Sequence, residues 1–265
     1  MALILIINKT NRKRSYHHLK ENFNRLSIIL ASETETRCRY RFNHQQIQFL
    51  VEIIKSKLSP FQMGYRPLSP ELQVMAALRY FASGAYFRVV ADSIGIEETS
   101  VRKSVWKVTA ALNEIAPQFI KFPKKQKEIQ QAMQSFYSIG GFPNVLGAID
   151  GTQIKIRKPP PEREEAFYCR KQYHSLNVQF ICNGEMIFTN CFARYPGSFH
   201  DSRIWRNSAV REFLESVNME HCWLLGDSGY PLEPWLLTPI INPQSRAEER
   251  YVFLINIIKT KINII

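Results

Sequence analysis

NVLGAIDGTQIKI, residues 144–156, is the stretch that decides the fold. Apolar and β-branched residues fill both of its ends, as is typical of a strand, and an Asp-Gly pair interrupts it at Asp150-Gly151. We predict one strand made of 144–149 and 153–156, with an acid in its middle. Because the chain before Gly140-Gly141 follows a helical period instead, a second domain is expected to begin close to that point.

The residues that follow this strand predict the rest of a sheet. Two β-rich runs, 177–182 and 186–193, flank Asn183-Gly184, which is a strong hairpin signal. A helix is expected over 201–217 and a short buried strand over 222–226. The order strand, strand, strand, helix, strand is that of a ribonuclease H-like core, in which the first and fourth strands lie side by side. Acids at the ends of those strands can therefore converge.

Upstream, the chain from 42 to 136 is predicted to be helical. Apolar residues recur at spacings of three and four between 43 and 58, as one helix face requires. Ser69-Pro70-Glu71 combines an N-cap, a proline at the first helical position and an acid in the first turn, and Gly84 is expected to end that helix. Two more helices are predicted, around 87–93 with Gly95 as its stop and around 99–115 with Thr99 or Ser100 as its cap.

Three helices with a glycine-containing turn resemble a helix-turn-helix module. In such a module the third helix lies in the major groove, where Arg102, Lys103 and Lys107 would reach phosphates or base edges. A helical bundle with a solvated basic face is the alternative. The formal charge of +12 and the pI near 9.5 favour a polyanionic partner, but lipid attraction or a solubility tail gives the same excess.

The remaining composition narrows the class of protein. Five cysteines without a CxxC pair indicate reduced, largely buried thiols and no zinc site. The opening MALILII is too short to span a membrane and lacks the flanks of a signal peptide, so we expect a protein that is neither secreted nor membrane-bound. Residues 1–40 show no sustained period and are expected to form a basic tail.

Three acids occupy special places in this layout: Asp150 on the first strand, Asp201 before the helix, and Asp227 just beyond the fourth strand. Singly, each has a structural explanation, as a turn, a helix N-cap and a loop residue respectively. Together they suggest phosphodiester hydrolysis, which needs a cluster of carboxylates to hold divalent cations. Two Mg²⁺ ions roughly 4 Å apart can stabilise both the attacking and the leaving oxygen.

Four stretches carry a resemblance to a known family: LGAIDGTQI (146–154), YPGSFHDSRIWRNS (195–208), LLGDSGYPLEPWLLTP (224–239) and NPQSRAEERY (242–251). They resemble PIF/Harbinger transposases and the Harbinger transposase-derived nuclease of animals, over residues 40 to 251. The resemblance implies a DDE-type catalytic fold, a nuclear location, Mg²⁺ or Mn²⁺ as cofactor and a Myb-like partner protein. It also implies that Asp150, Asp201 and Asp227 are metal ligands, while His200 packs against or orients Asp201.

The chain departs from that family near its last residues. The family's final glutamate, counted forward from Tyr251, falls on Asn263, and VFLINIIKTKINII (252–265) loses the family's helical pattern. We therefore expect an α+β protein with a basic tail (1–40), a helical DNA-binding region (41–136), a ribonuclease H-like DDE core (137–251) that is incomplete at its C-terminus, and a divergent tail (252–265). The predicted function is a metal-dependent DNA endonuclease, impaired by loss of that glutamate. The alternative is an inactive DNA-binding or adaptor protein of transposase origin.

Overall fold

The computed structural model describes residues 32–58, 68–217 and 221–262. Asn263 therefore lies outside the described residues, as does most of the predicted basic tail. The chain divides after Ala116 into two compact units. Each unit has its own hydrophobic core, and each is described separately below.

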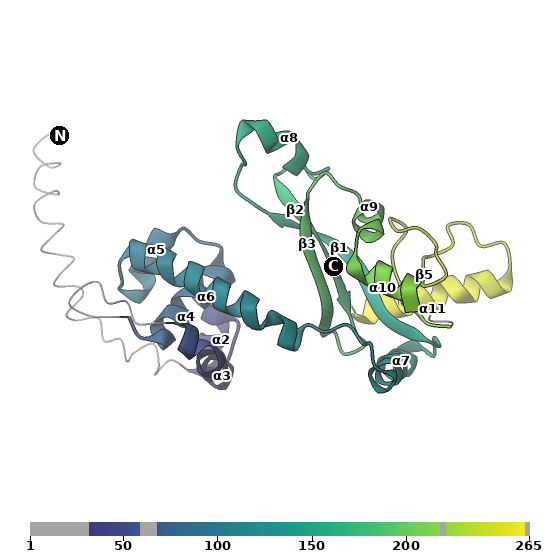
Figure 1. The fold of residues 1–265 in the computed structure, drawn as a ribbon, viewed down its shortest axis with the longest axis horizontal. Coiled ribbons are helices and arrows are strands. Elements are labelled where there is room, and N and C mark those ends of the chain that lie inside the picture. The colour runs from purple at the N-terminus through teal and green to yellow at the C-terminus, as the bar shows by residue number, and fades with distance from the viewer. Residues whose placement is uncertain (1–31, 59–67, 218–220, 263–265) are drawn as a thin grey trace, which may run out of the picture. The chain divides into compact units, whose positions relative to one another are not determined.

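The first unit is helical, as the sequence predicts (Figure 1). Ser69 caps the helix α4 by accepting a hydrogen bond from the N–H of Leu72, and Gly84 ends that helix in the left-handed conformation. Gly95 ends the next helix in the same way. The elements are α2 (Glu33–Tyr40), α3 (His44–Ile54), the 3₁₀ turn η2 (Lys55–Lys57), α4 (Pro70–Ser83), α5 (Phe87–Ile94) and α6 (Glu98–Phe119).

Two expectations for this unit are wrong. Glu33–Tyr40, assigned to the tail, form α2, because Ser32 caps the helix and Tyr40 is buried in the helical core. The last helix, α6, begins at Glu98, so neither Thr99 nor Ser100 is its cap, and it continues to Phe119 with Pro117 inside its final turns. Val101, Val105 and Val108 are among the residues that form its buried face.

The second unit is built on a five-stranded sheet with the order β3-β2-β1-β4-β5 (Figure 1). β1 and β3 each pair antiparallel with β2, while β4 runs parallel to both β1 and β5. This is the strand arrangement of a ribonuclease H-like core, and it confirms the predicted α+β fold. The strands are β1 (Val145–Lys155), β2 (Ser175–Cys182), β3 (Phe188–Pro196), β4 (Trp223–Leu225) and β5 (Leu236–Leu237).

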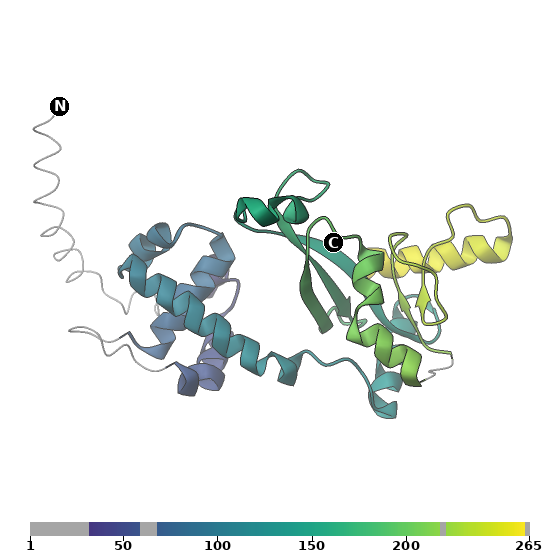
Figure 2. The same ribbon diagram turned by 45° about the horizontal axis from the view of Figure 1, so that its top comes forward.

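Helices cover both faces of this sheet (Figure 2). Neighbouring residues of a strand point to opposite faces, and Ile149 and Ala148 accordingly belong to two different core clusters. Ile149 packs in a cluster with Trp205 and Leu214, and Ala148 in a cluster with Ile255. The helices are α7 (Gln126–Gly140), α8 (Glu164–Phe167) with the preceding 3₁₀ turn η3 (Pro161–Arg163), α9 (Asp201–Arg206), α10 (Ala209–Val217) and α11 (Arg246–Ile262).

The last helix, α11, corrects the expectation that helical structure is lost after Tyr251. It runs to Ile262, and Ile255, Ile258 and Ile262 are buried in the cluster that contains Ala148. These three residues are three and four positions apart, so one face of the helix stays apolar although the composition has changed. The sheet face on this side is therefore covered by α11.

Three local details also differ from the sequence-based expectations or refine them. β1 passes through Asp150-Gly151 without interruption. The helix predicted over 201–217 is two helices, because Ser208 caps α10 by accepting a hydrogen bond from the N–H of Arg211. The predicted hairpin between β2 and β3 is present, with Met186 as its left-handed residue.

Candidate active site

The candidate site lies just beyond the last pair of residues that joins strands β1 and β4. Ala148 pairs with Leu225 in the parallel register of these strands. Asp150, within β1, and Asp227, just beyond the end of β4, each follow this pair by two residues. Asp150 Oδ1 accepts a hydrogen bond from the N–H of Gly151 at 2.8 Å, and Asp227 Oδ1 accepts one from the N–H of Gly229 at 2.8 Å.

Asp201 reaches the same region from the start of α9. It is the first residue of the helix, and the N-cap position belongs to His200, which makes no capping hydrogen bond through its side chain. Asn177 of β2 donates from Nδ2 to Asp201 Oδ1 at 2.9 Å and to the carbonyl of Phe199 at 2.9 Å. A side chain at Gly151 would overlap with Asp201 Oδ1, so glycine is needed there for the carboxylate to approach β1.

Asp201 and Asp227 lie on two sides of Gly229. A methyl group added at Gly229 would sit 3.1 Å from Asp227 Oδ1 and 3.4 Å from Asp201 Oδ2. Burial raises the pKa of Asp201 above its ordinary value of 3.8, the Asn177 hydrogen bond lowers it, and the negative charge of Asp227 raises it further. A second carboxylate in a half-buried place is costly without a cation, so this pair fits a divalent metal ion.

Asp150 is the third acid of this region, and its charge acts on Tyr230 together with those of Asp201 and Asp227. Because residues alternate along β1, Asp150 points to the sheet face opposite that of Ile149 and Gly151. Within the described parts of the chain, no three His, Cys, Asp or Glu side chains are gathered closely enough to hold a metal ion as they stand. The structure thus brings Asp201 and Asp227 to the two sides of Gly229, with Asp150 on the neighbouring strand β1.

Two polar residues near the acids escaped sequence reasoning. Asn177 is 3% exposed, and its predicted place in a β-rich run gave no sign that it would meet Asp201. Tyr230 is 5% exposed, and burial together with the charges of Asp201, Asp150 and Asp227 raises its pKa. In the sequence, the one hint that Tyr230 lies near the acids was its position in the DSGY stretch (227–230) that follows the fourth strand. His200, in contrast, is exposed, so its expected packing role is not supported.

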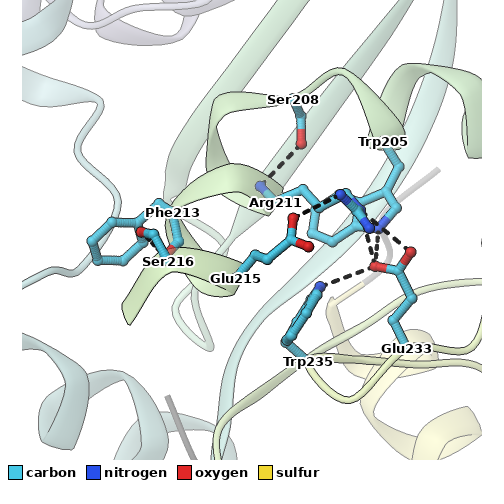
Figure 3. A network of polar contacts seen from close by, with 8 residues as sticks. All are labelled: Trp205, Ser208, Arg211, Phe213, Glu215, Ser216, Glu233 and Trp235. Carbon is cyan, nitrogen blue, oxygen red and sulfur yellow. Dashed lines mark hydrogen bonds and ion pairs between the residues drawn. The ribbon is translucent and has the colours of Figure 1, made fainter. Parts of the chain in front are cut away.

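A hydrogen-bond network connects the segments that carry Asp201 and Asp227 (Figure 3). Glu233 Oε2 accepts hydrogen bonds from the indole Nε1 of Trp205 at 2.9 Å and of Trp235 at 2.9 Å. Arg211 Nε donates to the same oxygen at 3.2 Å. Trp205 belongs to α9, which starts with Asp201, and Glu233 lies in the loop that starts with Asp227. Glu233 therefore ties the two acidic segments together.

The predicted DNA-contacting residues lie on α6, in the first unit. Arg102 and Lys103 are exposed and Lys107 is half-buried. Arg102 pairs with Glu98 at 3.3 Å, and its guanidinium lies 5.6 Å from the ring centre of Phe87. Part of its charge is therefore already engaged within the protein.

Comparisons with known proteins agree with this fold. Residues 149–252 match the family described as DDE superfamily endonuclease, and this span includes Asp150, Asp201 and Asp227. The chain is 37% identical over 212 residues to "Putative nuclease HARBI1" of both Rattus norvegicus and Homo sapiens, covering 80% of this chain and 60% of each relative. It is 27% identical over 236 residues to "Protein ALP1-like" of Arabidopsis thaliana, covering 80% of this chain and 57% of that protein.

The chain thus spans about 60% of the length of the HARBI1 relatives that it matches. No solved structure matches it. Among the described residues, no helix has the length and apolar character needed to cross a membrane. The element order, the strand topology and these relatives agree: the chain is similar to Harbinger transposase-derived nucleases, and its residues 149–252 match the DDE superfamily endonucleases.

Proposed function

We propose that this chain is a DNA endonuclease that depends on Mg²⁺ or Mn²⁺ held by Asp150, Asp201 and Asp227. The observation that carries the proposal is that the carboxylates of Asp201 and Asp227 lie on two sides of Gly229. This place follows the end of β4, the strand that pairs with the Asp150-bearing strand β1. Hard divalent cations prefer oxygen ligands of this kind. When bound, such ions supply Lewis-acid stabilisation of the scissile phosphate and an activated attacking oxygen.

The chain's own residues prepare the site for that chemistry. Asn177 fixes one oxygen of Asp201, which leaves the other oxygen on the side of Asp227. Glu233 holds α9 and the β4–β5 loop in a fixed relation, so the two carboxylates are kept close despite their repulsion. Asp150 contributes its charge from the neighbouring strand. Together the three carboxylates would supply the oxygen ligands that hard divalent cations prefer.

We also propose that cleavage by this polypeptide is weak. The position that matches the family's final glutamate is Asn263, whose amide offers a neutral oxygen and no charge. Because two adjacent divalent ions repel each other, loss of one carboxylate should weaken the second ion most. If cleavage is lost altogether, a DNA-binding adaptor is the second candidate, and the basic face of α6 favours it.

DNA is the proposed partner in both cases. Arg102, Lys103 and Lys107 on α6 would contact phosphates or base edges, as the third helix of a helix-turn-helix module does. The formal charge of +12 favours attraction to a polyanion over the whole chain. A nuclear location and a Myb-like partner protein follow from the family resemblance and belong to the same proposal.

A plasmid-nicking assay tests the proposed activity. Four proteins are compared with Mg²⁺, with Mn²⁺ and with EDTA: the full chain, Asp227→Asn, Asn263→Glu and Asp92→Asn, whose changed residue is exposed on α5. We expect slow metal-dependent nicking by the full chain and by Asp92→Asn, faster nicking by Asn263→Glu, and none by Asp227→Asn. Nicking that persists in Asp227→Asn or in EDTA would contradict the proposal.

A further inference from the structure

Beneath Asp201 lies a set of buried polar side chains whose hydrogen-bonding capacity is partly unused. Asn177 and Gln179 of β2 point to the same face as Ile149 and Gly151, and Tyr230 packs on that face from the β4–β5 loop. Among the described residues, Asn177 Oδ1, both side-chain polar atoms of Gln179 and the Tyr230 hydroxyl have no hydrogen-bond partner. Native proteins leave few buried polar atoms in this state, so each needs an explanation.

The Tyr230 hydroxyl is the most informative of these atoms. Its oxygen is closed off from solvent, so neither water nor a DNA phosphate can reach it without a rearrangement. The ring is also held in place: it lies in the core cluster with Leu236, and the N–H of Tyr230 donates to the carbonyl of Asp227 at 3.2 Å. Because the ring cannot easily swing out, the partner of the hydroxyl has to come to it.

Three carboxylates act on this hydroxyl, in addition to the buried amide groups of Asn177 and Gln179. Asp201, Asp150 and Asp227 all act electrostatically on the Tyr230 phenol, and Asp201 acts most strongly. Asn177 already occupies Asp201 Oδ1, whereas Oδ2 faces the Gly229 side near Asp227. Each carboxylate oxygen has two lone pairs, so Oδ2 can accept a hydrogen bond and still bind a cation.

We propose that Tyr230 is a positioning residue of the metal site: when a divalent cation draws Asp201 and Asp227 together, the Tyr230 hydroxyl donates a hydrogen bond to Asp201 Oδ2. Asn177 and Tyr230 then hold the two oxygens of one ligand, which fixes its orientation. Hydrogen bonds of this kind to metal-binding carboxylates raise metal affinity. This inference rests on the proposed metal-dependent function and assigns to Tyr230 a role that appears only when the cation is bound.

The substitution Tyr230→Phe tests this role, because it keeps the ring and removes only the hydroxyl. Without metal, in EDTA, the variant should melt at the same temperature as the full chain or higher, since an unpaired buried hydroxyl is removed. With metal, its affinity for Mn²⁺ measured by calorimetry should fall by about 10- to 100-fold. The matched control is Tyr251→Phe, which removes a hydroxyl that donates to the carbonyl of Thr238 at 2.9 Å. The control should lower the melting temperature and leave Mn²⁺ affinity unchanged.

The outcomes separate this inference from the proposed function. If the full chain binds Mn²⁺ and Tyr230→Phe binds it equally well, Tyr230 has no positioning role, while the metal site stands. A lower melting temperature of Tyr230→Phe in EDTA would show that the hydroxyl already has a partner, such as Gln179, and would also overturn the inference. If the full chain binds no Mn²⁺, the proposed function and this inference both fail.

Discussion

The two units place their candidate functional residues in opposite kinds of environment. On α6 the basic side chains are exposed or half-buried, and Arg102 contacts a neighbouring glutamate and an aromatic ring. At the ends of β1 and β4 the acids are half-buried, and Asp201 responds to its burial, to Asn177 and to Asp227 together. Exposed charges are screened and act nearly independently, whereas buried charges are coupled to their surroundings. Changes in the second unit should therefore have larger and less additive effects.

The largest effect on stability is expected from Glu233→Ala. The change leaves the indole N–H groups of Trp205 and Trp235 and the guanidinium of Arg211 without their shared acceptor. Leaving the partly buried indole donors unsatisfied should cost about 1–3 kcal/mol, and denaturant unfolding followed by tryptophan fluorescence would measure it. Glu215→Ala, which removes the exposed partner of Arg211, is the control and should cost about 1 kcal/mol or less. Equal losses from the two variants would mean that Glu233 does not link the acidic segments.

A smaller effect is expected when Arg102, Lys103 and Lys107 are all changed to Ala. DNA affinity should fall about 10-fold at moderate salt, and the slope of its salt dependence should decrease by about 1 for each phosphate that the protein no longer neutralises. Fluorescence anisotropy with a labelled duplex at several salt concentrations measures both. Lys55→Ala, at an exposed lysine paired with Glu52, serves as control. An unchanged affinity and slope in the triple variant would remove α6 from the DNA-binding surface.

The smallest effect, and one of opposite sign, is expected from Asp201→Asn in the metal-free protein. Since burial and Asp227 hold the pKa of Asp201 above 3.8 in the folded state, the neutral form is favoured by folding. The stabilisation that the protonated Asp201 gives to the folded state is complete below pH 3.8. It is lost as the pH rises through the raised pKa of Asp201 in the folded state. The Asn variant avoids this loss, so in EDTA it should melt higher than the full chain at neutral pH and equally near pH 3.8. A lower melting temperature at neutral pH would contradict this account of the Asp201 environment.

The same contrast shows how far the sequence could predict the molecule. Helix ends that are marked by a capping serine or a terminal glycine were predicted correctly, as at Ser69, Gly84 and Gly95. The first four strands followed from periodicity and turns, whereas the two-residue strand β5 was not predicted. The end of α11 was missed because its composition changed while the spacing of its buried isoleucines did not.

The site was harder to predict because its contacts join distant segments. Asn177 and Asp201 are 24 positions apart, and no local pattern reports their hydrogen bond. The position of Asp150 on the opposite face of β1 required the strand register, since the sequence suggested an interruption there. The family motifs indicated which acids matter, while the structure was needed to see how Asp201 and Asp227 are paired.

The most direct test of the central claim is Mn²⁺ binding by calorimetry to the full chain, Asp150→Asn, Asp227→Asn and the exposed-site control Asp92→Asn. The three-acid proposal predicts that the full chain and Asp92→Asn bind alike, and that each of the other two variants loses affinity by about 100-fold, because a neutral amide replaces a charged ligand. Asp227→Asn should lose most, since Asp227 lies across Gly229 from Asp201 and its charge acts on that carboxyl group. Unchanged affinity in both Asp150→Asn and Asp227→Asn would show that these acids are structural and would contradict the metal-dependent nuclease.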